Sequence, residues 1–169
     1  MSHKNLDDIY RSHMPEIFRY LLSLTRDGYW AEDLVQETFV RAYLHIEELD
    51  PPRIKPWLFK VAYHVFIDAV RKNKRQIVKD QPFFQQIKGN ASTEEEAITR
   101  NQLQELEEVL KTLPEKQKHA VLLADFHDLS YKESASIMEV SISYFKVLLF
   151  RGRQTLRRLK ERSDSADER

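Results

Sequence analysis

Cysteine is absent from this 169-residue chain, and no apolar run approaches the roughly 20 residues that span a bilayer. The lack of cysteine excludes disulfides, thiolate zinc sites and cysteine nucleophiles, and it is compatible with a reducing compartment. The polar start Met1–Asn5 has no hydrophobic region of a signal peptide. We therefore expect a soluble protein of the cytoplasm.

Glycine is scarce as well, with only Gly28, Gly89 and Gly152, which lie far apart. The chain therefore has no glycine-rich loop that could hold a phosphate. It also lacks the HExxH and G-x-S-x-G motifs, and its histidines show no obvious metal-binding spacing. We expect no enzymatic activity, no cofactor and no metal site.

Charge is present in quantity but unevenly distributed. Lysine and arginine number 27, as do aspartate and glutamate, so the net charge is zero. Basic residues crowd Arg71–Arg75 and Lys146–Arg162, whereas acidic residues gather in Glu32–Glu37 and Glu94–Glu108. Such separation indicates one surface for nucleic acid and another for a protein partner.

Apolar residues recur at helical spacing in three segments of residues 1–76. The first segment, Leu6–Thr25, ends at Asp27-Gly28, which resembles a C-terminal cap and turn. The second begins at Trp30 and ends before Asp50–Pro52, because proline disfavours further helix. The third follows that break. Three helices around one core predict a small first domain.

Helical periodicity is lost in residues 77–92, which contain Pro82 and Gly89, so we interpret this stretch as a flexible linker. Further helices are predicted within residues 93–162, and residues 163–169 are expected to form a disordered tail. The predicted fold class is all-α, with two small helical domains: a bundle of three to four helices and a domain that carries a helix-turn-helix.

The stretch Leu129–Arg153 has the layout of that helix-turn-helix. We predict a short helix over Tyr131–Met138, a turn near Glu139–Ser141 and a longer helix from about Ser143. At about 100° per residue, the longer helix has one apolar face for the core. Its other face carries Ser143, Val147, Phe150 and Gln154, flanked by Lys146, Arg151, Arg157 and Arg158.

A short, partly apolar face rimmed by cations suits a DNA major groove. The alternative is a solvated basic helix, which the short preceding helix and the tight turn make less favoured. Phe150 would belong to the core instead if the helical phase were shifted by one position.

Several segments carry a family resemblance. Asp33–Phe39, Lys55–Phe59 and Ile67–Lys72 resemble region 2 of sigma-70 RNA polymerase sigma factors, and Leu113–Ala124, Ser130–Ala135 and Phe145–Arg153 resemble region 4. Because no other domain intervenes, the chain is similar to the extracytoplasmic-function (ECF) subfamily, and within it to the sigma M type. The resemblance implies a bacterial factor that binds core polymerase and directs promoter-specific transcription initiation.

The resemblance implies that Asp33, Gln36 and Glu37 dock on the clamp coiled coil of the polymerase β′ subunit, while region 4 contacts the β flap. An acidic, amide-bearing face can meet a basic partner helix and orient it. From the residues alone, the favoured interpretation is that Glu32, Asp33 and Glu37 complement the helix dipole near a helix N-terminus. The family also implies a membrane-bound anti-sigma factor that holds the chain at the membrane, and a cell-envelope stress regulon.

Region 2 of the family opens the downstream promoter element, called −10, by holding a base out of the stack. Single-strand capture uses cations and aromatic platforms. The candidates on or near one helix face are Lys55, Lys60, Tyr63, His64 and Arg71. The family often has Arg-Asn where this chain has Tyr63-His64, so DNA contact by this pair stays open. We expect Trp57 in the core, and the turn Leu49–Lys55 resembles the loop that receives the flipped base.

In region 4, the matching positions implicate six residues in reading the upstream element, called −35: Ser143, Tyr144, Lys146, Val147, Phe150 and Arg151. Tyr144 lies toward the helix flank, where it could contact the DNA backbone or cap the turn. An alternative function is a stand-alone helix-turn-helix transcriptional regulator, which would bind duplex DNA without polymerase.

Overall fold

The computed structural model describes residues 6–73, 108 and 110–168, and these residues contain helices and no strand. The chain divides into two compact units, Met1–Ala91 (unit 1) and Ser92–Arg169 (unit 2). The predicted all-α class with two small helical domains is confirmed. The linker expected over 77–92 lies outside the described residues, and so does most of 93–110, so the predicted domain boundaries stay predictions.

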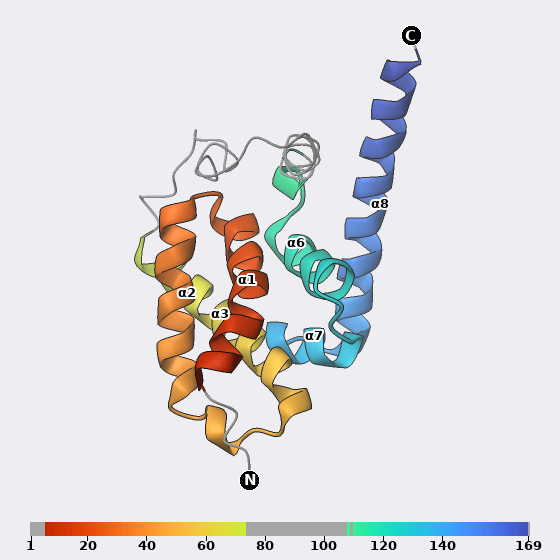
Figure 1. The fold of residues 1–169 in the computed structure, drawn as a ribbon. Helices are drawn as coiled ribbons and strands as arrows, with labels where there is room; N and C mark the ends of the chain where they lie inside the picture. The colour runs from red at the N-terminus through yellow and green to blue at the C-terminus, as the bar shows by residue number, and fades with distance from the viewer. Residues whose placement is uncertain (1–5, 74–107, 109, 169) are drawn as a thin grey trace. The chain divides into compact units, whose positions relative to one another are not determined.

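Unit 1 is a bundle of three long helices (Figure 1). α2 packs against both α1 and α3, and α1 also contacts α3. The elements are α1 (Leu6–Thr25), α2 (Gly28–Tyr43), the 3-10 helix η1 (Ile46–Glu48) and α3 (Pro51–Lys72). Pro51 and Pro52 stand at the start of α3, where a missing N–H costs no helical hydrogen bond.

The junction between α1 and α2 differs from the prediction. The Asp27 carboxylate accepts hydrogen bonds from the backbone N–H groups of Tyr29 and Trp30, at 3.0 and 3.3 Å. Asp27 is therefore the N-cap of α2 and Gly28 its first residue, whereas Arg26 takes the left-handed conformation with φ 57°. The predicted cap at Asp27-Gly28 was wrong because a carboxylate satisfies the free N–H groups of a helix start.

Large aromatic side chains fill the core of unit 1. Tyr20 and Phe59 are fully buried, with ring centroids 5.2 Å apart, and Phe39 meets Tyr10 edge-on at 4.9 Å. Full burial of a phenylalanine side chain such as Phe39 or Phe59 stabilises the fold by roughly 1.5–3 kcal/mol. Trp57, expected in the core, is only half-buried and stands edge-on to His45. The buried side of α3 runs instead through Ile54, Leu58, Phe59, Val61, Ala62, Val65 and Phe66.

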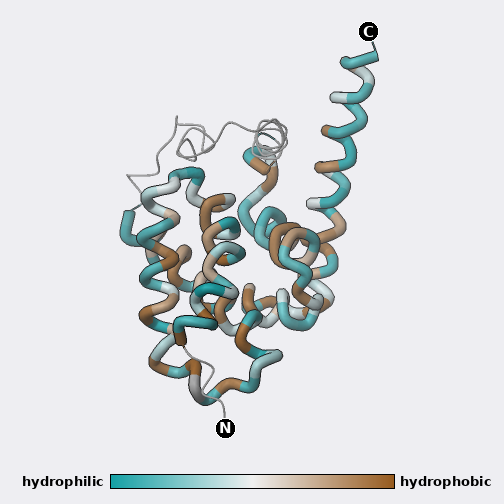
Figure 2. The backbone as a smooth tube through the Cα atoms, in the orientation of Figure 1, coloured by the Kyte–Doolittle hydropathy of each residue, from teal (hydrophilic) through white to brown (hydrophobic). Residues whose placement is uncertain are grey.

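Unit 2 packs a long helix, α8, against two shorter elements, α6 and α7. Figure 2 shows hydrophobic residues concentrated where these elements meet. The elements are α6 (Glu115–Val121), the π-helical turn η2 (Leu122–Phe126), α7 (Tyr131–Met138) and α8 (Ile142–Asp167). The predicted helix-turn-helix is confirmed, with its turn at Glu139–Ser141.

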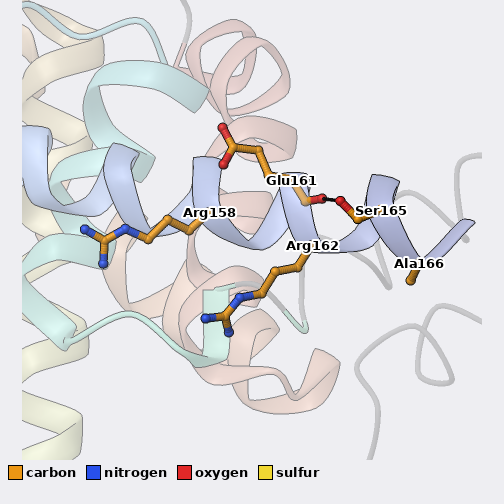
Figure 3. A pocket seen from close by; sticks show the side chains of 5 residues that line it. All are labelled: Arg158, Glu161, Arg162, Ser165 and Ala166. Atoms are coloured by element: carbon orange, nitrogen blue, oxygen red, sulfur yellow. Dashed lines mark hydrogen bonds between the residues drawn. The ribbon is translucent and has the colours of Figure 1, made fainter. Parts of the chain in front are cut away.

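The end of α8 extends further than predicted. Residues 163–167, expected within a disordered tail, continue α8 as far as Asp167. The sequence from Lys160 onward has no glycine or proline that would stop a helix. None of the described residues of α8 after Gly152 is buried. Figure 3 shows Arg158 and Arg162 projecting to the same side there, where they line a shallow pocket together with Glu161, Ser165 and Ala166.

Candidate functional site

The outward face of α8 carries all six residues predicted to read the upstream element. Ser143, Tyr144, Lys146, Val147, Phe150 and Arg151 are exposed, whereas Phe145, Leu148, Leu149 and Gly152 are buried. The predicted helical phase is therefore confirmed. Phe150 is 61% exposed, so it does not belong to the core. Base contact by these residues stays a prediction.

Two caps and a left-handed residue set the direction of α8. The Ser130 hydroxyl accepts from the Glu133 N–H at 3.0 Å, and the Glu133 carboxylate accepts from the Ser130 N–H at 2.9 Å, which starts α7. α7 ends at Met138, and its C-cap residue Glu139 turns the chain with a φ of 57°. The Ser141 hydroxyl then accepts from the Tyr144 N–H at 3.1 Å and starts α8.

Arg153 ties α8 to η2 and to the start of α7. Its guanidinium donates to both carboxylate oxygens of Asp125, at 2.9 and 2.5 Å, and to the Tyr131 hydroxyl at 3.4 Å. The hydrogen bonds to Asp125 raise the pKa of Arg153 above its usual value. A two-pronged pair of this kind orients a helix. Arg153 therefore differs from Lys146 and Arg151, because its charge is already engaged within the protein.

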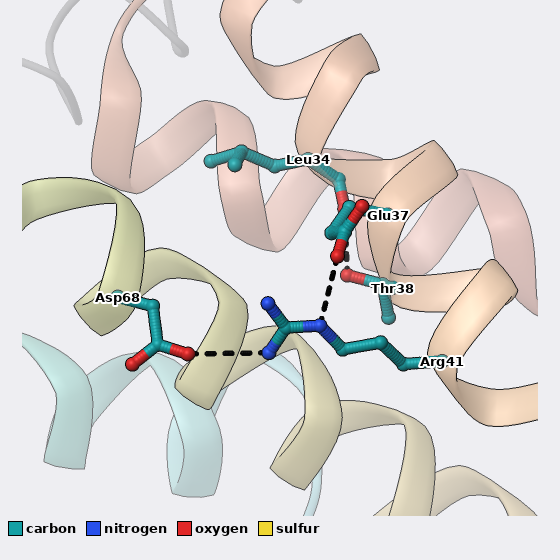
Figure 4. A network of polar contacts seen from close by, with 5 residues as sticks. All are labelled: Leu34, Glu37, Thr38, Arg41 and Asp68. Carbon is teal, nitrogen blue, oxygen red and sulfur yellow. Dashed lines mark hydrogen bonds and ion pairs between the residues drawn. The ribbon is translucent and has the colours of Figure 1, made fainter. Parts of the chain in front are cut away.

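The acidic face of α2 is exposed at Asp33, Gln36 and Glu37, the three residues predicted to bind polymerase. Figure 4 shows Glu37 linked to Asp68 of α3 through Arg41. Arg41 donates from Nε to Glu37 at 2.9 Å and from Nη1 to Asp68 at 3.2 Å. The hydrogen bond to Glu37 raises the pKa of Arg41. Sequence reasoning missed Arg41, although its spacing of four residues from Glu37 is a visible signal.

On α3, four of the five predicted −10 residues share one side, and the fifth does not. At about 100° per residue, Lys60, Tyr63, His64 and Arg71 fall within an arc of about 100°. All four are at least partly exposed, and the Tyr63 and His64 rings meet edge-on at 5.6 Å. Lys55 falls on the packed side, and its Nζ lies 3.1 Å from the carboxylate of Glu16 on α1.

Other kinds of site find little support in the described ranges. Residues 6–73, 108 and 110–168 contain no group of three or more histidine, aspartate or glutamate side chains placed to hold a metal ion. No helix in the part of the chain that the structure describes is long and apolar enough to cross a membrane.

Family models match both units. Residues 9–76 match the model described as Sigma-70 region 2, and residues 103–156 match the model described as Sigma-70, region 4. The ECF RNA polymerase sigma factor SigM of Bacillus subtilis (strain 168) is 41% identical over 161 residues, which cover 93% of this chain and 96% of that protein.

Two solved structures share the fold at lower identity. The sigma factor RpoE, in complex with the anti-sigma factor NepR from Bartonella quintana, has a TM-score of 0.72 at 24% identity, over 94% of this chain and 98% of that chain. CnrH, in complex with the cytosolic domain of CnrY, has a TM-score of 0.68 at 19% identity, over 92% of this chain and 87% of that chain. Since both sigma regions match in order and a 41% identical relative spans nearly the whole length, the chain belongs to the ECF family of RNA polymerase sigma factors, which are transcription initiation factors and not enzymes.

Proposed function

We propose that three helix faces divide the work of initiation: α2 docks on core RNA polymerase, α3 captures the opened −10 element and α8 reads the −35 element. The observation that carries the proposal is the face of α8, where Lys146, Phe150 and Arg151 point outward while the opposite side is held in the core. A helix presented by a helix-turn-helix in this way is suited to the major groove.

The chemistry of the α8 face supports base reading. Lysine and arginine can donate to guanine acceptors, and apolar side chains can contact the thymine methyl group. Exposed apolar side chains gather at this end of α8, with Ile142, Tyr144, Val147 and Phe150 between 41% and 61% exposed. A cluster of this kind is typical of a surface that a partner covers.

The face of α2 has the character of a docking surface for the clamp coiled coil of the β′ subunit. Its polar centre consists of Asp33, Gln36 and Glu37. Exposed apolar residues lie on both sides of this centre along the chain, with Tyr29, Val40 and Leu44 at 79%, 61% and 77% exposure. At about 100° per residue, these residues and Asp33, Gln36 and Glu37 fall within an arc of about 100°. A polar centre with apolar ends can give both orientation and affinity to a partner helix.

Charge reversal tests the polymerase interface. We expect Asp33→Lys with Gln36→Lys to abolish co-purification with core polymerase, because a basic partner surface would then meet like charge. The matched control is Asp8→Lys on α1, which changes an exposed acid of the same unit. Unchanged circular dichroism would show that both variants fold. Co-purification at the level of the control would overturn the proposed role of α2.

The −10 surface is tested by strand opening. We propose that Lys60, Tyr63, His64 and Arg71 hold the opened strand, since cations can bind its backbone and rings can stack on its bases. Tyr63→Ala is expected to reduce open-complex formation, measured by permanganate reactivity, at unchanged polymerase binding. Lys55→Ala serves as the comparison, because Lys55 is paired with Glu16. Equal effects of the two substitutions would contradict the division between the two sides of α3.

We also propose that a membrane-bound anti-sigma factor holds the chain inactive and that its regulon answers cell-envelope stress. Similarity to the two solved structures supports an anti-sigma partner, since both of those proteins were captured in complexes and one complex contains an anti-sigma factor. The chain should move from the membrane fraction to core polymerase when the envelope is damaged. A constant fraction on polymerase before and after damage would contradict this regulation.

A further inference from the structure

Lys116 of α6 extends over the first turn of α8. Its Nζ lies 5.7 Å from the centroid of the Tyr144 ring. A cation at this distance from an aromatic face is attracted by the ring. The charge of Lys116 is thus placed beside the exposed face of α8, although its own helix is not the one expected in the groove.

The acid next to Lys116 in the sequence is directed elsewhere. The two carboxylate oxygens of Glu115 lie 3.7 Å from Lys118 Nζ and 3.6 Å from His119 Nε2, and both of these side chains are buried. Lys116 is exposed, and within the described ranges it forms no ion pair. Its positive charge is therefore not neutralised by a carboxylate in this part of the protein.

Close packing fixes α6 relative to α8. A Cβ added at Gly152 would lie 2.7 Å from Val121 Cγ2 and 3.3 Å from the Gln117 carbonyl oxygen. The backbone that carries Lys116 is thus held against the same helix as Tyr144. The backbone position of Lys116 therefore follows that of α8.

We propose that Lys116 contacts a DNA phosphate that borders the groove in which α8 reads the −35 element. This inference rests on the proposed function of α8. Base-reading side chains need neighbours that bind phosphates and fix the register of the helix on the duplex. The major groove is about 12 Å wide, so a cation at the flank of a helix in the groove faces its phosphate wall. Tyr144 holds the ammonium group in place, and lysine binds phosphate as a point charge.

The salt dependence of promoter binding tests the contact. We would measure the affinity of core polymerase with the full chain for a promoter duplex over a range of salt concentrations. Affinity falls as salt rises, and removing one phosphate-binding cation makes the slope of log affinity against log salt less steep by about 0.9. Lys116→Gln is expected to reduce the steepness by this amount, and Lys116→Arg is expected to retain the wild-type slope.

Lys160→Gln is the matched control. It removes the same charge from an exposed position of α8 that lies 16 residues after Tyr144, or about 24 Å along the helix. It should leave the slope unchanged. If Lys116 only supported Tyr144, Lys116→Gln would change the affinity and leave the salt slope unchanged. A wild-type slope for Lys116→Gln would therefore overturn the proposed contact.

A scrambled −35 element separates this proposal from the one on which it rests. The wild-type complex should bind the scrambled promoter more weakly. Equal binding of intact and scrambled promoters would overturn the reading of DNA by α8, and with it the Lys116 contact. A normal loss on scrambling, together with equal slopes for Lys116→Gln and Lys160→Gln, would overturn the Lys116 contact alone.

Discussion

Gly152 of α8 and Val121 of α6 are in direct packing contact, and the space between them has no room for another methyl group. A Cβ built on Gly152 would approach Val121 Cγ2 to 2.7 Å, and Val121 is fully buried. The added Cβ would also lie 3.3 Å from the Gln117 carbonyl oxygen, which belongs to the backbone of α6. The glycine therefore allows the close approach of the helix that presents the candidate DNA-reading face.

Gly152→Ala is expected to destabilise unit 2. Overpacking costs about 1–3 kcal/mol, and the better helix preference of alanine returns about 1 kcal/mol, so the free energy of unfolding should fall by up to about 2 kcal/mol. Urea unfolding followed by circular dichroism measures the change. Tryptophan fluorescence gives an internal control, because Trp30 and Trp57 both lie in unit 1. A gain in stability would show that Val121 can give way.

The cations of α8 should separate into two groups. Lys146→Ala and Arg151→Ala are each expected to weaken use of the −35 element by about 1–3 kcal/mol, because their exposed side chains can reach base edges. Arg153→Met should instead lower the stability of unit 2 by about 0.5–1 kcal/mol, since it removes a partly exposed ion pair with Asp125. The ratio of binding to intact and scrambled upstream elements distinguishes the two. A large loss of that ratio in Arg153→Met would refute the separation.

Glu139 carries backbone strain at the turn of the helix-turn-helix, because its φ is 57°. The left-handed conformation destabilises a residue that has a side chain by about 1–2 kcal/mol, and glycine avoids this cost. Glycine in turn destabilises the fold by about 0.5–1 kcal/mol, because it loses more backbone entropy on folding. Glu139→Gly should therefore stabilise unit 2 by about 0.5–1 kcal/mol. Ser136→Gly, one turn earlier in α7, is the control and should destabilise by about 0.5 kcal/mol. Equal losses in both variants would mean that Glu139 makes contacts worth more than the strain.

His119 should make unit 2 sensitive to mild acid. Burial, with a smaller contribution from the charge of Lys118, lowers the pKa of His119 to about 3. At neutral pH the imidazole is therefore uncharged, and its approach to Glu115 is not an ion pair. The unfolded chain binds a proton below about pH 6.5 and the folded chain does not, so stability is complete above that pH and falls as the pH drops.

The expected loss is about 1.4 kcal/mol per pH unit below about pH 6.5. Urea unfolding at about pH 7.5 and about pH 5.5 should show it, and His119→Gln should remove most of the difference. A difference that persists in His119→Gln would place the titrating group elsewhere.

Periodicity predicted much of the fold because it depends on local geometry. The phase of α8, which turns Phe145 inward and Phe150 outward, follows from the spacing of apolar residues alone. The spacing did not show that Trp57 would stand at the edge of the core while Phe59 filled it, because helix curvature and neighbouring packing decide such positions. Asp27-Gly28 was misread because the same residues can end one helix or start the next.

Long-range contacts were beyond the reach of the sequence. Lys55 and Glu16 are 39 positions apart, and Arg153 and Asp125 are 28 apart, so no local pattern pairs them. These pairs decide which cations are engaged within the protein and which are available to DNA. Arg41 is intermediate, since its bond to Glu37 follows helical spacing but its bond to Asp68 joins two helices.

Reconstituted transcription over a genomic DNA library, with start sites mapped for core polymerase alone and with the protein added, would decide whether this chain places polymerase on promoters. We predict a set of start sites that appears only with the protein and shares two short elements at fixed spacing upstream. The Lys146→Ala and Arg151→Ala variants should weaken selection of the upstream element. Start sites that are the same with and without the protein, or tight binding of the protein alone to its upstream element, would contradict promoter placement by this chain and favour a stand-alone regulator.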